Sequence, residues 1–248
     1  MGLGPRRPCP ESRVHAAGPR NLPLRWSTKK EKKEVMPLLF RALVEALAWT
    51  VAPNRCAACE ADLPWMTAFC GACARTLTLP EARDKKHVAA FVYGGAIAQA
   101  IVRLKFERRP DVARPLAAAL RRAGRVMASE PPDVVIPVPL HPRRLVERGF
   151  NPSALLARPV AKDLGARFLP RGLSRHMDTE PQVTLDRSAR LTNVAGAFKT
   201  PSPDLVRARR VLIIDDVRTT GATLLACAEA LLHAGARDVC TLVVAEAV

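Results

Sequence analysis

The stretch VLIIDDVRTTGAT, from Val211 to Thr223, decides the fold class. Its first four residues, VLII, are apolar and mostly β-branched, which is typical of a strand buried on both faces. Two carboxylates, Asp215 and Asp216, follow, and a run of small and hydroxyl-bearing residues then leads into an apolar helical pattern. A buried strand that passes at once into a helix predicts a βα unit of a parallel sheet.

The residues between this strand and the helix are suited to binding an anion. Small side chains allow backbone N–H groups to converge on a phosphate, and a helix N-terminus adds a favourable dipole. A glycine in the turn allows positive φ and a close approach of the backbone. We therefore predict a phosphate-binding loop formed by Thr219, Thr220, Gly221, Ala222 and Thr223.

The two acids beside this loop need a different partner, because carboxylates repel an anion. We expect Asp215 and Asp216 to face neutral ribose hydroxyls or a Mg²⁺ ion. A strand that ends in a solvated acidic turn is the alternative interpretation, and the acid pair alone does not decide between them. An ATPase of the GxxxxGK[ST] type is excluded, because the chain contains no Gly-Lys pair.

Working outward, strand and helix patterns alternate through the rest of the chain. Strands are expected at 87–95, 133–138, 211–214 and 239–245, and helices at 96–106, 112–127, 152–164 and 222–234. This order predicts an α/β domain over 87–248, with a mostly parallel sheet flanked by helices and ligands bound at the carboxyl ends of its strands. The polar segment 171–200 predicts a long loop or a β-arm, and loops of that length are usually functional.

The N-terminal region differs in composition from the rest. Residues 1–35 are rich in Pro, Gly and Arg and predict a disordered basic leader. Two interpretations are open: translation begins at Met36 and the leader is a gene-start artefact, or the leader is a tail that binds nucleic acid. An amphipathic helix is expected over 36–53, too short and too polar for a membrane span. We expect no membrane span and a cytoplasmic protein.

A cysteine module is expected over 54–80. Its four cysteines have the spacing C-x2-C-x10-C-x2-C, and four thiolates suit a closed, structural Zn²⁺ site. An iron–sulfur cluster and unligated thiols are the alternatives. The total of seven cysteines and the paired spacing favour metal binding in a reducing compartment over a disulfide framework. The predicted ligands are Cys56, Cys59, Cys70 and Cys73.

The charge of the chain indicates which partners it attracts. The formal net charge is +16, which favours nucleotides, sugar phosphates or nucleic acid as partners, although a general preference for Arg would give the same excess. Aromatic residues make up only 4% of the chain, which argues against a surface that stacks many bases.

Several motifs together resemble a known family. The loop from Val211 to Thr223 is similar to the fingerprint of type I phosphoribosyltransferases, which bind phosphoribosyl pyrophosphate (PRPP). With it, YGGAIAQAIVRLKFERR at 93–109, IPVPLHPRRLVERGFN at 136–151 and RHMDTEPQVTLDRSARLTNVAGAF at 175–198 resemble the ComF family. These are competence-associated, phosphoribosyltransferase-like proteins with a cysteine module in front. Pro152 departs from the Gln usual in the family, so a ligand contact by that Gln is missing here.

The resemblance implies a type I phosphoribosyltransferase-like fold and a set of site residues. The turn after the first core strand would bind pyrophosphate, and segment 175–198 would form a mobile loop over the reacting centre. Mg²⁺ would accompany PRPP. Lys105 is either functional or complements a helix dipole. The implied residues are Val138, Pro139, Leu140, Arg148 and Asn151 near the pyrophosphate, Gln182 and Asn193 as polar loop contacts, and Arg187 and Arg190 as catalytic candidates.

Two main functions are compatible with these patterns. An active phosphoribosyltransferase would join PRPP to an amine or base that the sequence does not name. Alternatively, the fold is reused without catalysis by a protein that binds single-stranded nucleic acid, in DNA uptake for natural competence and beside a competence helicase. A PRPP-sensing regulator is a third class, but no helix-turn-helix pattern supports it.

Overall fold

The computed structural model describes residues 55–63, 67–81, 86–127, 129–176 and 196–247. The chain separates into two units, Met1–Glu45 and Ala46–Val248, and every described residue belongs to the second. The predicted leader and the amphipathic helix at 36–53 lie outside the described residues.

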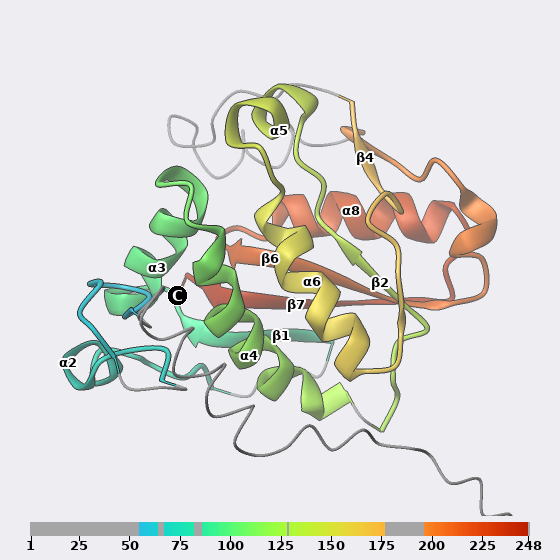
Figure 1. Cartoon of the computed structure of the whole chain (residues 1–248). Helices are drawn as coiled ribbons and strands as arrows, with labels where there is room; N and C mark the ends of the chain where they lie inside the picture. The colour runs from blue at the N-terminus through green and yellow to red at the C-terminus, as the bar shows by residue number, and fades with distance from the viewer. Residues whose placement is uncertain (1–54, 64–66, 82–85, 128, 177–195, 248) are drawn as a thin grey trace, which may run out of the picture. The chain divides into compact units, whose positions relative to one another are not determined.

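A five-stranded parallel sheet forms the centre of the second unit (Figure 1). Its strands stand in the order β1-β7-β6-β2-β3, and each neighbouring pair is parallel. The sequence predicted four of these strands and missed the shortest, at the edge. The bounds are β1 His87–Val92, β2 Val134–Pro137, β3 Arg167–Phe168, β6 Arg210–Arg218 and β7 Asp238–Glu246.

Helices cover both faces of the sheet, which confirms the predicted α/β class. Alternate residues of β6 divide between two cores: Leu212 and Ile214 pack with helices α3, α4 and α6, whereas Val211 and Ile213 pack with α8. In Figure 1, α4 and α6 cross in front of the strands. The helices are α3 Gly95–Phe106, α4 Ala113–Ala123, α6 Pro152–Asp163 and α8 Ala222–His233.

Shorter elements complete the described chain. The single helix predicted over 112–127 is three pieces: the 3₁₀ turn Pro110–Val112, α4, and the 3₁₀ turn Gly124–Met127. Helix α5, Pro142–Arg148, follows the turn after β2, and the four-residue helix α2, Gly71–Ala74, lies in the cysteine module. Strands β4 Ser174–Arg175 and β5 Phe198–Lys199 pair antiparallel, so the two ends of the predicted loop or arm lie side by side.

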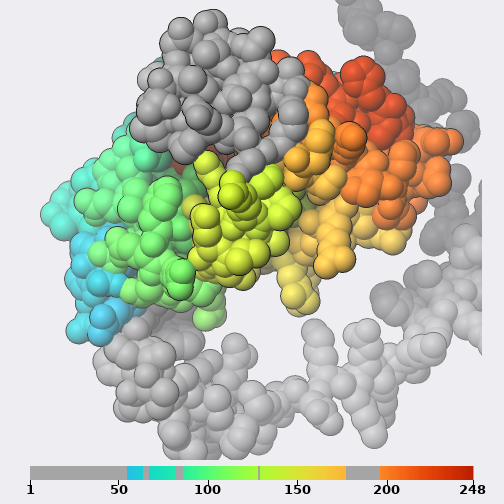
Figure 2. Space-filling view, turned by 90° about the horizontal axis from the view of Figure 1, so that it is seen from above, coloured from blue at the N-terminus to red at the C-terminus, as the bar shows by residue number. Residues whose placement is uncertain are grey.

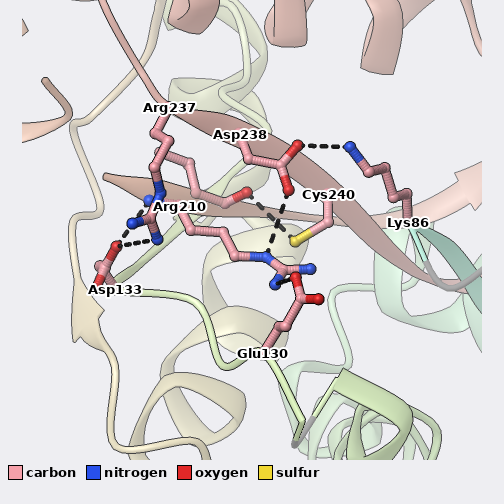
Figure 3. A network of polar contacts seen from close by, with 8 residues as sticks. Lys86, Glu130, Asp133, Arg210, Arg237, Asp238 and Cys240 are labelled. Carbon is pink, nitrogen blue, oxygen red and sulfur yellow. Dashed lines mark hydrogen bonds and ion pairs between the residues drawn. The ribbon is translucent and has the colours of Figure 1, made fainter. Parts of the chain in front are cut away.

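Ion pairs gather where the parallel strands begin (Figure 3). The first residue of β6, Arg210, is only 8% exposed and forms ion pairs with Glu130 and Asp238. Its backbone N–H donates to the carboxylate of Asp133, 2.7 Å away, just before β2. Asp238 also accepts from Lys86 Nζ at 2.8 Å, just before β1. This network at the amino end of the sheet neutralises charges that burial would otherwise make costly.

Candidate functional site at the carboxyl end of the sheet

Strand β6 carries the two acids beyond the end of its neighbour β2. Pro137, the last residue of β2, pairs with Ile214, whereas β6 continues beside β7 until Arg218 pairs with Glu246. The sequence predicted that the strand would end at Ile214, which is wrong. The strand is longer because β7 runs on beside it, and Arg218 and Glu246 form an ion pair at the end.

Asp215 lies against the first turn of α6. Its Oδ1 accepts a hydrogen bond from Ser153 Oγ at 2.8 Å and from the backbone N–H of Asp216 at 2.9 Å. Ser153 is 4% exposed and is held in place because Asn151 caps α6 by accepting from its backbone N–H at 3.0 Å. The N-cap of α6 therefore fixes the orientation of the Asp215 carboxylate through Ser153.

Asp216, the next residue of β6, is 5% exposed. Its Oδ1 is 2.7 Å from Lys105 Nζ, in the last turn of α3. Burial lowers the pKa of Lys105, but the charges of Asp216 and Asp215 outweigh it and raise the pKa above its ordinary value. Lys105 is therefore a charged partner of the acid pair, whereas the sequence left its role open.

The two carboxylates share a site that does not favour two negative charges. Burial and the neighbouring Asp216 carboxylate raise the pKa of Asp215 to about 7, while Lys105 and the Ser153 hydroxyl act in the opposite direction. A carboxyl that is partly protonated near neutral pH is poised to lose its proton when a cation or a polar ligand arrives.

Arg148 supplies a second positive group near the acids. Its charge interacts with that of Asp216, and its guanidinium lies 5.3 Å from the centre of the Phe106 ring. The backbone carbonyl of Glu147 accepts from Arg108 at 2.9 Å, so the end of α5 is held against the end of α3. Figure 2 shows α5 (yellow-green) beside α3 (green) on this surface.

The loop from Thr219 to Thr223 follows directly from the strand that carries the acids. Gly221 has φ +80°, the left-handed conformation that the sequence analysis expected of it, and α8 begins at Ala222. Thr220 Oγ1 accepts from the backbone N–H of Ala222 at 3.4 Å. Residues 217–224 line a hollow of about 40 Å³, room for a small anion group beside the helix N-terminus.

The turn after β2 lies at the same rim. The backbone N–H of Val138 donates to Ile214 at 2.9 Å, and Asn151 Nδ2 donates to the carbonyl of Val138 at 3.0 Å. Pro139 and Leu140 follow, half-buried, before α5 begins. Val138, which Asn151 holds, therefore lies beside Ile214, the residue that directly precedes Asp215 in β6.

Four predicted site residues fall in the part of the chain that the structure does not describe, and one residue of the site was missed. Gln182, Arg187, Arg190 and Asn193 lie outside the described residues. Ser153 was not predicted, although a small hydroxyl residue in the first turn of a helix next to a predicted ligand turn was a signal for it. Its contact with Asp215 joins segments 62 residues apart, which no local pattern reveals.

The four cysteines of the module come together as predicted. Their sulfur atoms all lie within 4.8 Å of one another, and Cys59 Sγ is 3.6 Å from Cys70 Sγ. Four sulfurs at Zn–S distances of about 2.3 Å in a tetrahedron stand about 3.8 Å apart. The donor set and its geometry therefore fit a tetrahedral metal ion held by four thiolates.

Local hydrogen bonds already favour thiolate at part of this cluster. Burial raises the pKa of Cys56, but hydrogen bonds from the backbone of Cys59, Cys70 and Ala58 outweigh it and bring the value to about 6. Burial, with crowding by the other thiols, raises the pKa of Cys73 to about 12. Four thiols this close cannot all ionise without a cation between them.

Comparison with known proteins identifies the family. The chain is 36% identical over 151 residues to the DNA utilization protein YhgH of Escherichia coli O6:H1, covering 59% of this chain and 66% of the relative, just under two thirds of its length. It is 30% identical over 189 residues to Competence protein F of Haemophilus influenzae, covering 74% of this chain and 81% of the relative. The chain belongs to the ComF family.

Other similarities accompany this ComF membership. Adenine phosphoribosyltransferase of Streptomyces galbus is 36% identical over 108 residues, covering 42% of this chain and 55% of the relative. The glutamine PRPP amidotransferase structure from B. subtilis, with ADP and GMP bound, aligns with a TM-score of 0.39 and 20% identity, over 57% of this chain and 30% of the other. No protein-family model matches the chain. Among the described residues of this ComF protein, no helix is long and apolar enough to cross a bilayer.

Proposed function

We propose that the carboxyl end of the sheet binds PRPP, or a related ribose phosphate, together with Mg²⁺. The observation that carries this proposal is the order of chemical groups along β6 and the loop that follows it. Two carboxylates with a lysine partner pass directly into a glycine-containing loop at a helix N-terminus. Carboxylates suit ribose hydroxyls and Mg²⁺, and converging backbone N–H groups suit phosphate.

The individual residues would divide this work. Asp215 and Asp216 would hold the ribose hydroxyls or the metal, and the loop from Thr219 to Thr223 would hold a phosphate. The turn from Val138 to Leu140, with Asn151 and Arg148 beside it, would face the pyrophosphate. Arg187 and Arg190, with Gln182 and Asn193, would close over it from the segment outside the described residues.

If the site is catalytic, it would act by positioning and by charge neutralisation. The bond between ribose C1 and the pyrophosphate oxygen would break, with its electron pair leaving on pyrophosphate. A nitrogen of an amine or base would then form the new bond to C1. Cationic groups near the leaving pyrophosphate would stabilise its developing charge.

The cysteine module would hold a structural Zn²⁺ through Cys56, Cys59, Cys70 and Cys73. Four protein ligands complete a tetrahedral shell, so no coordination position is left for a substrate. Bound metal would neutralise the crowded thiolates and stabilise a module whose described residues include few buried side chains: Cys56, Ala57, Ala58 and Leu63.

The decisive experiment removes both negative charges of the site. We expect the double variant Asp215→Asn, Asp216→Asn to lose at least about 100-fold in affinity for Mg²⁺–PRPP, because several charge-assisted contacts of about 1.5–3 kcal/mol each disappear. Calorimetric titration with PRPP measures this. Asp204→Asn, at an exposed acid that pairs with Arg207 just before the amino end of β6, is the matched control.

Unchanged PRPP affinity in the double variant would show that the site is misplaced. Release of pyrophosphate from PRPP, measured across a panel of amines and bases, would then separate an enzyme from a binding protein. Turnover with any acceptor supports a phosphoribosyltransferase.

A second function is favoured by the names of the relatives and by the charge. The relatives are called DNA utilization protein and Competence protein F, and this chain has a net charge of +16. We propose as the alternative that the protein binds single-stranded nucleic acid during DNA uptake for competence, beside a helicase, and without catalysis. No PRPP turnover, together with single-strand binding that weakens steeply with salt, would favour this alternative.

A further inference from the structure

Helix α3 connects the cysteine cluster to the acid pair. Its C-terminal turn carries Lys105, which binds Asp216. Its N-terminal and C-terminal turns both contact the cysteine module. Figure 2 shows the module (blue to cyan) against the green part of the molecule. Both contacts come from residues near the cysteine ligands in the chain.

The first contact is made by Glu60, the residue after Cys59. Its Oε1 is 2.7 Å from Arg103 Nη1 in the last turn of α3, and it also pairs with Arg109 just beyond that helix. Glu60 has φ +63°, and its backbone N–H donates to the carbonyl of Cys56 at 3.0 Å. The knuckle around Cys56 and Cys59 therefore fixes the carboxylate that grips the end of α3.

The second contact is made by Thr76, three residues after Cys73. Thr76 Oγ1 donates to the carbonyl of Cys73 at 2.8 Å and accepts from the backbone N–H of Ala96, in the first turn of α3, at 3.0 Å. Gly95 has φ +48°, and a Cβ there would lie 2.7 Å from Thr76 Oγ1. The start of α3 and the second knuckle are thus fitted closely to each other.

We propose that Glu60 is a positioning residue that couples the cysteine cluster to the ribose-phosphate site through α3 and Lys105. This inference rests on the proposed function of that site. When the cluster holds its metal, the knuckle around Cys56 and Cys59 keeps Glu60 in place, and Glu60 keeps the last turn of α3 where Lys105 reaches Asp216. Coupling of this kind is reciprocal, so PRPP should also tighten the hold on the metal.

The competing explanation is that core packing alone fixes α3. Ile97, Ala100, Ile101 and Leu104 are buried in the core that α3 shares with α4 and α6. This packing holds the helix against the sheet, but the buried face does not include Arg103 or Lys105. If core packing were sufficient, the charge on Glu60 would have no effect on the acid pair.

The test compares two glutamates that face the same arginine. Glu60→Gln breaks the link between module and helix, whereas Glu107→Gln removes the other acid near Arg103, which lies 3.8 Å away within the same helical segment. Each protein is purified without chelator, its zinc content is measured, and PRPP affinity is titrated. We expect Glu60→Gln to keep its metal but to lose at least about fivefold in PRPP affinity, and Glu107→Gln to match the wild type.

A cycle with Lys105→Met shows whether the effect passes through Lys105. We expect Glu60→Gln to cause no further loss of affinity in the Lys105→Met background, whereas a general structural defect would weaken both backgrounds equally. Equal PRPP affinities of the Glu60→Gln and Glu107→Gln variants would overturn the inference. So would an equal loss of affinity from Glu60→Gln in the wild-type and Lys105→Met backgrounds. The inference would also fail if the purified wild-type protein contained no metal.

Amide hydrogen exchange makes the result independent of the proposed function. If wild-type protein fails to bind PRPP, the proposed function is refuted. Hydrogen exchange then still tests whether the cysteine cluster holds the last turn of α3 through Glu60. Chelation should then speed exchange in the last turn of α3 in the wild type and in Glu107→Gln, and Glu60→Gln should already exchange at the faster rate with metal bound. Unchanged exchange in α3 after chelation would overturn the coupling.

Discussion

The two ends of the parallel sheet treat their charges in opposite ways. At the amino end, three acids and three bases face one another: Glu130, Asp133 and Asp238 with Lys86, Arg210 and Arg237 (Figure 3). At the carboxyl end, Lys105 forms an ion pair with Asp216 and interacts electrostatically with the adjacent Asp215, whose pKa is raised to about 7. The ion pairs of the amino end serve stability, whereas the carboxyl end holds a buried carboxyl that is partly protonated near neutral pH and available to a ligand.

The largest effect is expected from a substitution that disrupts the ion-pair network at the amino end of the sheet. Arg210→Met should lower the free energy of unfolding by about 2 kcal/mol, because it removes the buried guanidinium that pairs with the partly buried carboxylate of Asp238. Arg237→Met is the matched control: its side chain is 65% exposed and its Nη2 lies 3.7 Å from Asp133 Oδ2, so its loss should cost under about 1 kcal/mol. Denaturant unfolding measures both. Equal costs at the two positions would contradict the view that burial makes this end structural.

The next prediction concerns pH and belongs to the carboxyl end. The pKa of Asp215 in the folded protein is about 7, above its ordinary value of 3.8. The folded state therefore binds a proton more tightly than the unfolded chain, and this contribution to stability is present at low pH and is lost as pH rises through about 7. If the carboxylate form binds Mg²⁺–PRPP, affinity should rise with pH up to about 7 and level off above it.

Titration of PRPP binding between about pH 5.5 and about pH 8.5 measures this dependence, with unfolding followed over the same range. Asp215→Asn should flatten the stability profile below pH 7, since the asparagine does not titrate. A profile that is the same in the variant and the wild type would show that another group titrates, and would remove the reason to treat the two ends differently.

The sequence predicted the part of each end that depends on local pattern. The buried run of β6 and the glycine at the start of α8 were both predicted, because periodicity and turn chemistry are local. The length of β6 was predicted wrongly, because it depends on β7 continuing beside it. Edge strand β3 has two residues and therefore no period to detect.

The site shows the same division between local and distant information. The acid pair and the loop after it were predicted together because they are contiguous in the chain. The partners of the acids are not contiguous: Lys105 and Ser153 lie more than 60 residues away from them and come together only when α3 and α6 pack on one face of the sheet. The balanced network at the amino end was not predicted for the same reason.

The smallest effect is expected from alanine substitutions at two glycines near the carboxyl end of the sheet. Gly221 and Gly149 have nearly the same φ, +80° and +81°, and a Cβ at either would meet no atom closer than 4.0 Å. Alanine at either position should cost about 1 kcal/mol of stability through left-handed strain alone. Only Gly221→Ala should also weaken PRPP binding, because its backbone lies in the loop that would approach the phosphate. Equal binding by the two variants, at equal cost in stability, would mean that the loop shapes the start of α8 and does not hold the ligand.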